Sequence, residues 1–243
     1  MKRRALLIGS PGVPGTKTYL EDMTKIDLNK IKNYLMSNTG GKWYENEILL
    51  LDTNDIDEVK KHINYVKNEY NDFVFCAFSG HGWYDGNKDS RVFEIGGSDL
   101  YESEFRQLSK KQLSIYDSCA EVYTPKVLTE NRIMAGMLSS DSIDYKDYRE
   151  IYNNEIIKCH QQEINLYSSS KNEFSQTDED LGGHFIHYLL KVGASNQTKN
   201  LDAIDAFQIT KEQMKDDKRS QNPSSSYPKS ARNFLPFSLG KYA

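Results

Sequence analysis

The sequence lacks the features that would direct it to a membrane or out of the cell. No apolar run approaches the ~20 residues that a membrane-spanning helix needs. The apolar run at 5–8 follows basic residues, as in a signal peptide, but it ends at Gly9 and meets Pro11 and Pro14. We therefore expect a protein that is neither secreted nor membrane-bound.

Cysteine is scarce as well. The three residues, Cys76, Cys119 and Cys159, are widely spaced and form neither a C-x-x-C motif nor a Cys/His cluster of metal-binding spacing. This pattern disfavours a disulfide-rich secreted module and a zinc module, and it fits a reducing cytoplasm.

An excess of basic charge is also missing. The chain has 31 Lys and Arg against 35 Asp and Glu, for a net charge of −4, and the two signs are interleaved. A protein that binds the phosphate backbone needs a basic face, so nucleic acid is not an expected partner. The 243 residues suit one domain that buries a core without disulfides.

What the sequence does contain is a regular alternation of short apolar runs with amphipathic segments. The expected strands are 5–9, 48–51, 73–78, 113–116 and 164–167, and the expected helices are 26–36, 55–70, 185–192 and 202–214. A hairpin is expected near 92–97, and a loop over 221–230. This order of βα units predicts an α/β fold with a mostly parallel central sheet.

Two of the expected strands end in residues that carry chemistry. Strand 73–78 runs into Ser-Gly-His81-Gly, and strand 113–116 runs into Asp-Ser-Cys119-Ala. Sites in open α/β sheets form beyond the carboxyl ends of strands, so both tips can face one crevice. A histidine there can take the proton of a thiol, whose ordinary pKa is ~8.5, and leave a nucleophilic thiolate. His81 is therefore the candidate general base and Cys119 the candidate nucleophile.

Acyl transfer at such a thiol also needs hydrogen-bond donors for the oxyanion, each worth ~3 kcal/mol. The backbone N–H groups of Gly82 and Cys119 are the candidates. Taken singly, His81 can be explained as a strand cap and Cys119 as a small core residue. Their occurrence at the ends of two core strands favours a site.

These motifs, in this order, resemble the caspase and metacaspase family, whose His-Gly and Asp-Ser-Cys motifs follow such strands. The likeness continues at 5–9, 14–17, 167–175 and 183–186. It implies a three-layer αβα sandwich and a cysteine endopeptidase that acts on proteins or peptides through a thioester. It also implies one domain, with a large-subunit-like part at 1–138 and a small-subunit-like part at 164–243. Residues 139–163 between them are polar with little apolar periodicity, so we expect an exposed linker that can be partly helical.

The departures from the caspase pattern concern specificity. Asp117 stands where the caspase signature has glutamine, and Thr177 falls where caspases carry an aspartate-reading arginine. By resemblance to metacaspases, Asp117, Asp27 and Ser175 belong to the S1 pocket, which is then acidic and accepts Arg or Lys at P1. Coulomb attraction agrees with this preference. The alternative is that Asp27 caps a helix and Asp117 caps a turn.

The resemblance also bears on regulation. The chemistry requires no cofactor, and no metal site is predicted. By resemblance to metacaspases, which often use calcium held by surface carboxylates, Asp85 and Asp89 are candidate calcium ligands. Family members are often latent until the linker is cut, here at Lys146, Arg149 or Lys158, or until a small molecule or protein partner activates them. Bacterial relatives resemble cell-death or antiviral effectors. The sequence does not indicate an oligomeric state.

Three alternatives stay open beside this interpretation. A catalytically silent sensor or binding module would keep the fold and lose the chemistry. A phosphate-binding loop at 9–18 would need G-x-x-x-x-G-K-[ST], but Thr16 follows Gly15. A dyad of Cys159 and His160 is disfavoured because adjacent side chains diverge in helices and strands alike.

Overall fold

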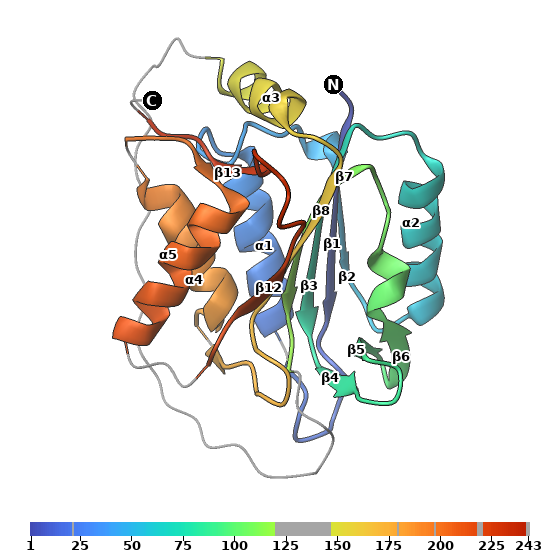
Figure 1. Ribbon diagram of the computed structural model, residues 1–243. Helices are drawn as coiled ribbons and strands as arrows, with labels where there is room; N and C mark the ends of the chain where they lie inside the picture. The colour runs from blue at the N-terminus through green and yellow to red at the C-terminus, as the bar shows by residue number, and fades with distance from the viewer. Residues whose placement is uncertain (21, 120–146, 179, 197, 218–220, 242–243) are drawn as a thin grey trace.

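A six-stranded sheet forms the centre of the computed structural model (Figure 1). The structure describes residues 1–20, 22–119, 147–178, 180–196, 198–217 and 221–241. The strand order is β12-β8-β7-β3-β1-β2, and every neighbouring pair is parallel except β12 and β8. The strands are β1 (Arg3–Ser10), β2 (Ile48–Asp52), β3 (Phe73–Gly80), β7 (Lys111–Asp117), β8 (Gln162–Tyr167) and β12 (Ser224–Ser226).

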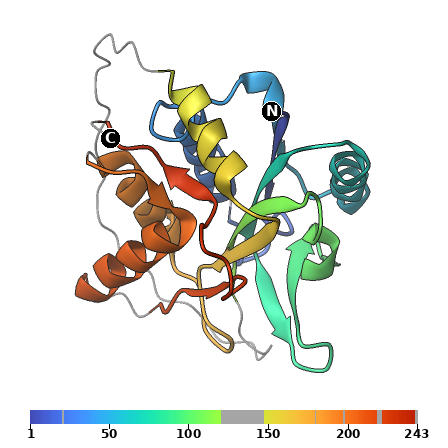
Figure 2. The ribbon, with the colours of Figure 1, turned by 45° about the horizontal axis from the view of Figure 1, so that its top comes forward.

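Helices cover both faces of this sheet, as Figures 1 and 2 show. One face carries α1 (Met23–Met36), α4 (His184–Ser195) and α5 (Ala203–Asp216). The other carries α2 (Ile56–Asn68), the small sheet β4 (Gly82–Asp85), β5 (Ser90–Ile95) and β6 (Ser98–Tyr101), and the short helix η2 (Glu102–Phe105). The predicted three-layer αβα architecture is confirmed. Among the described residues, no helix is long and apolar enough to cross a membrane.

The remaining elements are short or lie outside the central sheet. They are η1 (Glu45–Glu47), α3 (Tyr148–Lys158), β9 (Thr177–Asp178), β10 (Gly182–Gly183), β11 (Leu201–Asp202) and β13 (Pro236–Ser238). The pairs β9 with β10 and β11 with β13 are antiparallel.

The core strands are buried on both faces, which explains their continuous apolar runs. In β1, Ala5 and Leu7 join the core on the side of α1, whereas Leu6 and Ile8 join the core on the side of α2. The period-2 alternation of side chains divides β3 in the same way. The strands expected from these runs are therefore confirmed.

The expectation of an exposed linker over 139–163 is wrong in its second half. Residues 147–163 include the helix α3 and the start of β8. One side of α3 is buried through Tyr148, Tyr152 and Ile156, which pack into the same core as α1. The spacing i, i+4, i+8 is helical, but two of its three members are tyrosines in a polar stretch, so the apolar periodicity is weak. Residues 139–146 lie outside the described part of the chain.

Two other local predictions need correction. The loop expected over 221–230 contributes the short edge strand β12, and the segment after His81 forms β4, which was not predicted. Both strands are four residues or shorter and carry no run of apolar residues.

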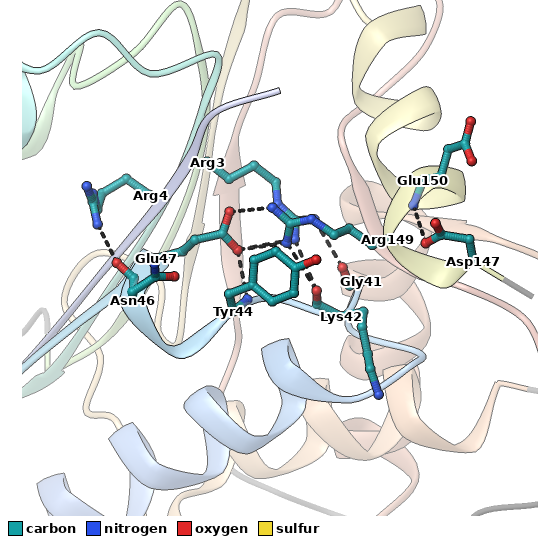
Figure 3. A network of polar contacts seen from close by, with 10 residues as sticks. All are labelled: Arg3, Arg4, Gly41, Lys42, Tyr44, Asn46, Glu47, Asp147, Arg149 and Glu150. Atoms are coloured by element: carbon teal, nitrogen blue, oxygen red, sulfur yellow. Dashed lines mark hydrogen bonds and ion pairs between the residues drawn. The ribbon is translucent and has the colours of Figure 1, made fainter. Parts of the chain in front are cut away.

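A network of charges fixes α3 to the end of the sheet where β1 begins (Figure 3). The side chain of Arg3 is fully buried, lies 4.4 Å from the ring centroid of Trp43, and pairs with Glu47 at 3.4 Å. Arg149 of α3 donates to the two oxygens of Glu47 at 2.6 and 2.8 Å. Two arginines from distant parts of the chain thus share one carboxylate.

We expect Glu47→Gln to lower the free energy of unfolding by about 3 kcal/mol, because it leaves the buried Arg3 guanidinium without its counter-charge. Urea unfolding followed by circular dichroism measures this. The matched control is Glu45→Gln, two residues away, where the glutamate side chain is 74% exposed and pairs with Lys32 at the surface. That control should show no measurable change, and equal effects of the two substitutions would contradict the role given to Glu47.

Candidate active site

The two sequence motifs lie at the ends of neighbouring strands. The strands β3 and β7 pair in parallel with Ser79 opposite Asp117. His81 and Cys119 each follow two residues later, so both lie beyond the carboxyl ends of the strands at one edge of the sheet. The segments that carry them are in contact, since a side chain on Gly82 would come within 2.9 Å of Ser118 Oγ.

The imidazole of His81 is oriented by the loop that follows β1. Its Nε2 lies 2.5 Å from the carbonyl oxygen of Thr18. A carbonyl only accepts hydrogen bonds, so this geometry assigns the proton to Nε2 and leaves Nδ1 of the neutral ring as the basic nitrogen. Gly12, at φ +88°, packs against the ring, and a Cβ there would lie 2.9 Å from Cδ2.

Cys119 is partly exposed, and its thiol donates to the carbonyl oxygen of Ser175 at 3.8 Å. The preceding residue, Ser118, is held by the serines that follow β8. Its N–H donates to Ser168 Oγ at 3.1 Å, and its carbonyl accepts from the hydroxyls of Ser168 and Ser169 at 3.1 and 3.2 Å. Sequence reasoning assigned no role to these two serines, although the serine run directly after an expected strand was the available signal.

A buried arginine lies behind the same serines. Arg91 of β5 donates to the carbonyl oxygen of Ser169 at 2.5 Å, and its guanidinium lies 4.3 Å from the ring centroid of Tyr167. Burial lowers the pKa of Arg91, and Tyr167 and Glu102 partly offset that effect. Nothing in the sequence distinguished Arg91 from a surface residue of the hairpin.

Asp27 and Asp117 come together beneath β10. Their exposed fractions are only 1% and 4%. The N–H of Gly183 donates to both oxygens of Asp27 at 2.9 and 3.1 Å, and the N–H of Ile186 donates to Asp117 Oδ2 at 3.2 Å. A Cβ on Gly183 would lie 2.1 Å from Asp117 Oδ2 and 3.2 Å from Asp27 Oδ2, so both carboxyl groups pack closely against this glycine and lie near each other.

Two serines complete this group of carboxyls. Ser79 donates to Asp27 Oδ2 at 2.6 Å, and the hydroxyl of Ser175 donates to Asp117 Oδ1. Ser175 therefore contacts the Cys119 thiol through its carbonyl and Asp117 through its hydroxyl. The three residues predicted for S1 thus lie together, next to the candidate nucleophile. Ser79 was missed, although it is the one hydroxyl in an otherwise apolar strand and stands two residues before His81.

The carboxyl pair is electrostatically unfavourable when fully ionised. Burial, and then the charge of Asp117, raise the pKa of Asp27 to about 8 against the opposing hydrogen bonds from Ser79 and Gly183. Burial raises the pKa of Asp117 as well. The nearest lysine, Lys30, directs its ammonium to the carbonyl oxygen of Leu181 at 2.7 Å.

The two carboxylates considered for calcium are engaged elsewhere. Asp89 pairs with Lys171 at 2.8 Å, and Asp85 accepts from the N–H groups of Asn87 and Lys88. No group of three or more metal-binding side chains occurs among the described residues. Of the described residues, Asp85 and Asp89 thus belong to no cluster of the kind that holds a metal ion.

The sequence as a whole matches one known protein family. The family model described as "Caspase domain" matches residues 2–235. The chain belongs to the caspase-domain family. This is a family of cysteine peptidases that act on protein substrates, so the predicted family resemblance is confirmed at the level of the family. The roles of its individual residues stay predictions.

Structural and sequence similarity to individual proteins is more distant. The crystal structure of caspase-1 from Spodoptera frugiperda matches with a TM-score of 0.65 and 12% identity, covering 99% of this chain and 90% of that chain. At this identity the match shows the fold of the caspase-domain chain alone. No curated protein matches the sequence.

The candidate self-cleavage positions differ in their surroundings. Lys146 lies outside the described residues. Arg149 is in the first turn of α3 and is paired with Glu47, which is a poor state for a protease substrate, since nicking favours exposed loop tips. Lys158 ends α3 with an exposed side chain. The structure thus disfavours Arg149 among the three.

We expect iodoacetamide to modify Cys119 first in the native protein at pH 7. Cys76 and Cys159 are buried, and burial raises the pKa of Cys76 far above its usual range and that of Cys159 to about 11. Peptide mass spectrometry identifies the modified residue. His81→Ala should slow the modification of Cys119 only, because a neighbouring imidazole favours the thiolate. Faster labelling of Cys76 or Cys159 would contradict this assignment.

Proposed function

We propose that this caspase-domain chain is an endopeptidase in which His81 and Cys119 form a catalytic dyad that cleaves after Arg or Lys. The observation that carries the proposal is the parallel pairing of β3 with β7. It supports a dyad because the strands end in register, with the two candidate residues at the same distance beyond the paired Ser79 and Asp117.

The reaction follows from the chemistry of these groups. Nδ1 of His81 takes the thiol proton, and the thiolate of Cys119 attacks the scissile carbonyl carbon. The backbone N–H groups of Gly82 and Cys119 are assigned to the oxyanion. The intermediate collapses to a thioester while the imidazolium gives its proton to the leaving amine. Water then hydrolyses the thioester with His81 as base. The Thr18 carbonyl, 2.5 Å from Nε2, keeps the ring oriented throughout.

Specificity rests on the carboxyl pair beside the nucleophile. A substrate whose scissile carbonyl meets Cys119 would direct its P1 side chain along Ser175, which contacts both the thiol and Asp117. Carboxyl groups shielded from water favour a cation and penalise an acidic side chain. The P1 residue is therefore Arg or Lys in this proposal.

A latent state belongs to the same proposal. The burial of Asp27 and Asp117 supports latency, because a substrate must displace the Ser175 hydroxyl to reach them. The resemblance to bacterial effectors adds a role in cell death or antiviral defence, with a small molecule or protein partner as the activating signal. Full activity of the purified chain without any partner would contradict the latency.

We expect the active protein to cleave a fluorogenic peptide with Arg or Lys at P1 and to leave the same peptide with Asp uncleaved. Cys119→Ala should abolish cleavage, and Asp117→Asn should lower kcat/KM for the Arg peptide by roughly a hundredfold, since one buried counter-charge is removed. Cleavage that survives Cys119→Ala would exclude the dyad. If Cys119 is alkylated as expected but no peptide is cleaved under any condition, the chain is a silent caspase-fold module.

A further inference from the structure

We propose that Asp27 and Asp117 share one proton in the empty pocket, and that a cationic P1 side chain expels this proton to solvent when it binds. Substrate binding would then be coupled to pH through the specificity pocket and not only through the catalytic dyad. The inference rests on the proposed function, because it takes the carboxyl pair as the P1 site.

The geometry of the pair supports a shared proton. A Cβ on Gly183 would meet an oxygen of each carboxyl group, so the two groups lie close together, and both are almost completely removed from water. Among the described residues neither forms an ion pair. Two carboxylates in such a position repel each other strongly, so one of them keeps its proton.

The surrounding charged groups do not cancel this repulsion. From α1, Lys30 attracts Asp27, but it is bound to a backbone carbonyl and is also drawn to Asp178 of β9. From α4, the buried His184 follows Gly183 directly in the chain. The groups that β3 and β10 direct at Asp27 are the neutral donors Ser79 and the Gly183 N–H.

The direction of the titration agrees with the geometry. Burial is the largest influence on both carboxyls, and it raises the pKa of each. The hydrogen bonds from Ser79 and Gly183 oppose this rise at Asp27 and do not overcome it. In this proposal the empty pocket carries one negative charge at neutral pH, with Asp27 as the main holder of the proton.

A bound cation favours ionisation of both carboxyl groups. The ammonium or guanidinium of P1 supplies a positive charge and N–H donors, and it replaces the Ser175 hydroxyl at Asp117. Both carboxyls can then ionise, and one proton leaves for each cation that enters. Because binding releases a proton, affinity should increase with pH by up to tenfold per unit, and it should level off once the empty pair ionises by itself.

The binding test uses Cys119→Ala, which cannot turn over, under the conditions in which the wild type cleaves a peptide with Arg at P1, and it uses that same peptide. Isothermal titration calorimetry in two buffers of different ionisation enthalpy counts the protons. We expect close to one proton released per peptide at pH 7 and none above about pH 9. The matched peptide with citrulline, the neutral isostere of arginine, should release none. The added substitution Asp27→Asn should abolish the release with the Arg peptide.

A second test needs no substrate. The native Asp27 holds a proton that the unfolded chain gives up near pH 4, so the protein should lose stability as pH rises from about 5 to 8. The unfolding equilibrium constant should increase by up to tenfold per pH unit on account of this group. Asp27→Asn should remove that slope, because an amide does not titrate. The exposed Asp99→Asn should leave it unchanged.

The outcomes separate this inference from the proposed function. Two results would contradict the shared proton and leave the proposed peptidase activity standing. The first is cleavage after Arg with no proton release on binding. The second is cleavage after Arg with the same pH dependence of stability in the wild type and in Asp27→Asn. If the stability of the wild type falls with pH as expected but the Arg peptide does not bind, the carboxyl pair is not the P1 site, and the proposed coupling of proton release to substrate binding is wrong. Release of one proton that depends on Asp27 supports the inference.

Discussion

The pairing of β3 with β7 is the constraint on which the site depends. Side chains alternate along a strand, so the register that sets Ser79 opposite Asp117 directs both toward α1 and α4, where Asp27 lies. The same register brings the two motif loops to one edge. A slip of one residue would turn Asp117 to the opposite face of the sheet and separate the pocket from Cys119.

The sequence was sufficient for the parts of the fold that local patterns determine. Continuous apolar runs predicted the core strands because both faces of the sheet are buried. The residues that follow two of these strands suggested the His81 and Cys119 dyad, which stays a prediction. The burial of α3 was not predicted because Tyr148 and Tyr152 supply much of its buried face. The contacts of Ser79 and Ser168 depend on which strands become neighbours, and a local pattern does not contain that information.

Charge is buried at both ends of the sheet, with opposite consequences. At the end where β1 begins, Arg3 and Arg149 surround the carboxylate of Glu47, so each buried charge has a partner and the network stabilises the fold. At the other end, Asp27 and Asp117 are buried beside each other, and the donors bonded to them from the described part of the chain are neutral. Such an unbalanced arrangement is unfavourable for folding, and groups of this kind concentrate at functional sites.

The contacts of α3 and β8 hold the two parts of the chain together. Arg149 binds Glu47, the Tyr152 ring lies 5.7 Å from the Arg3 guanidinium, and β8 pairs with β7 along its length. The parts of the chain before residue 120 and after residue 146 are therefore joined by a shared sheet and core, independently of the peptide that connects them. A nick between the two parts would produce a noncovalent heterodimer with the same interior.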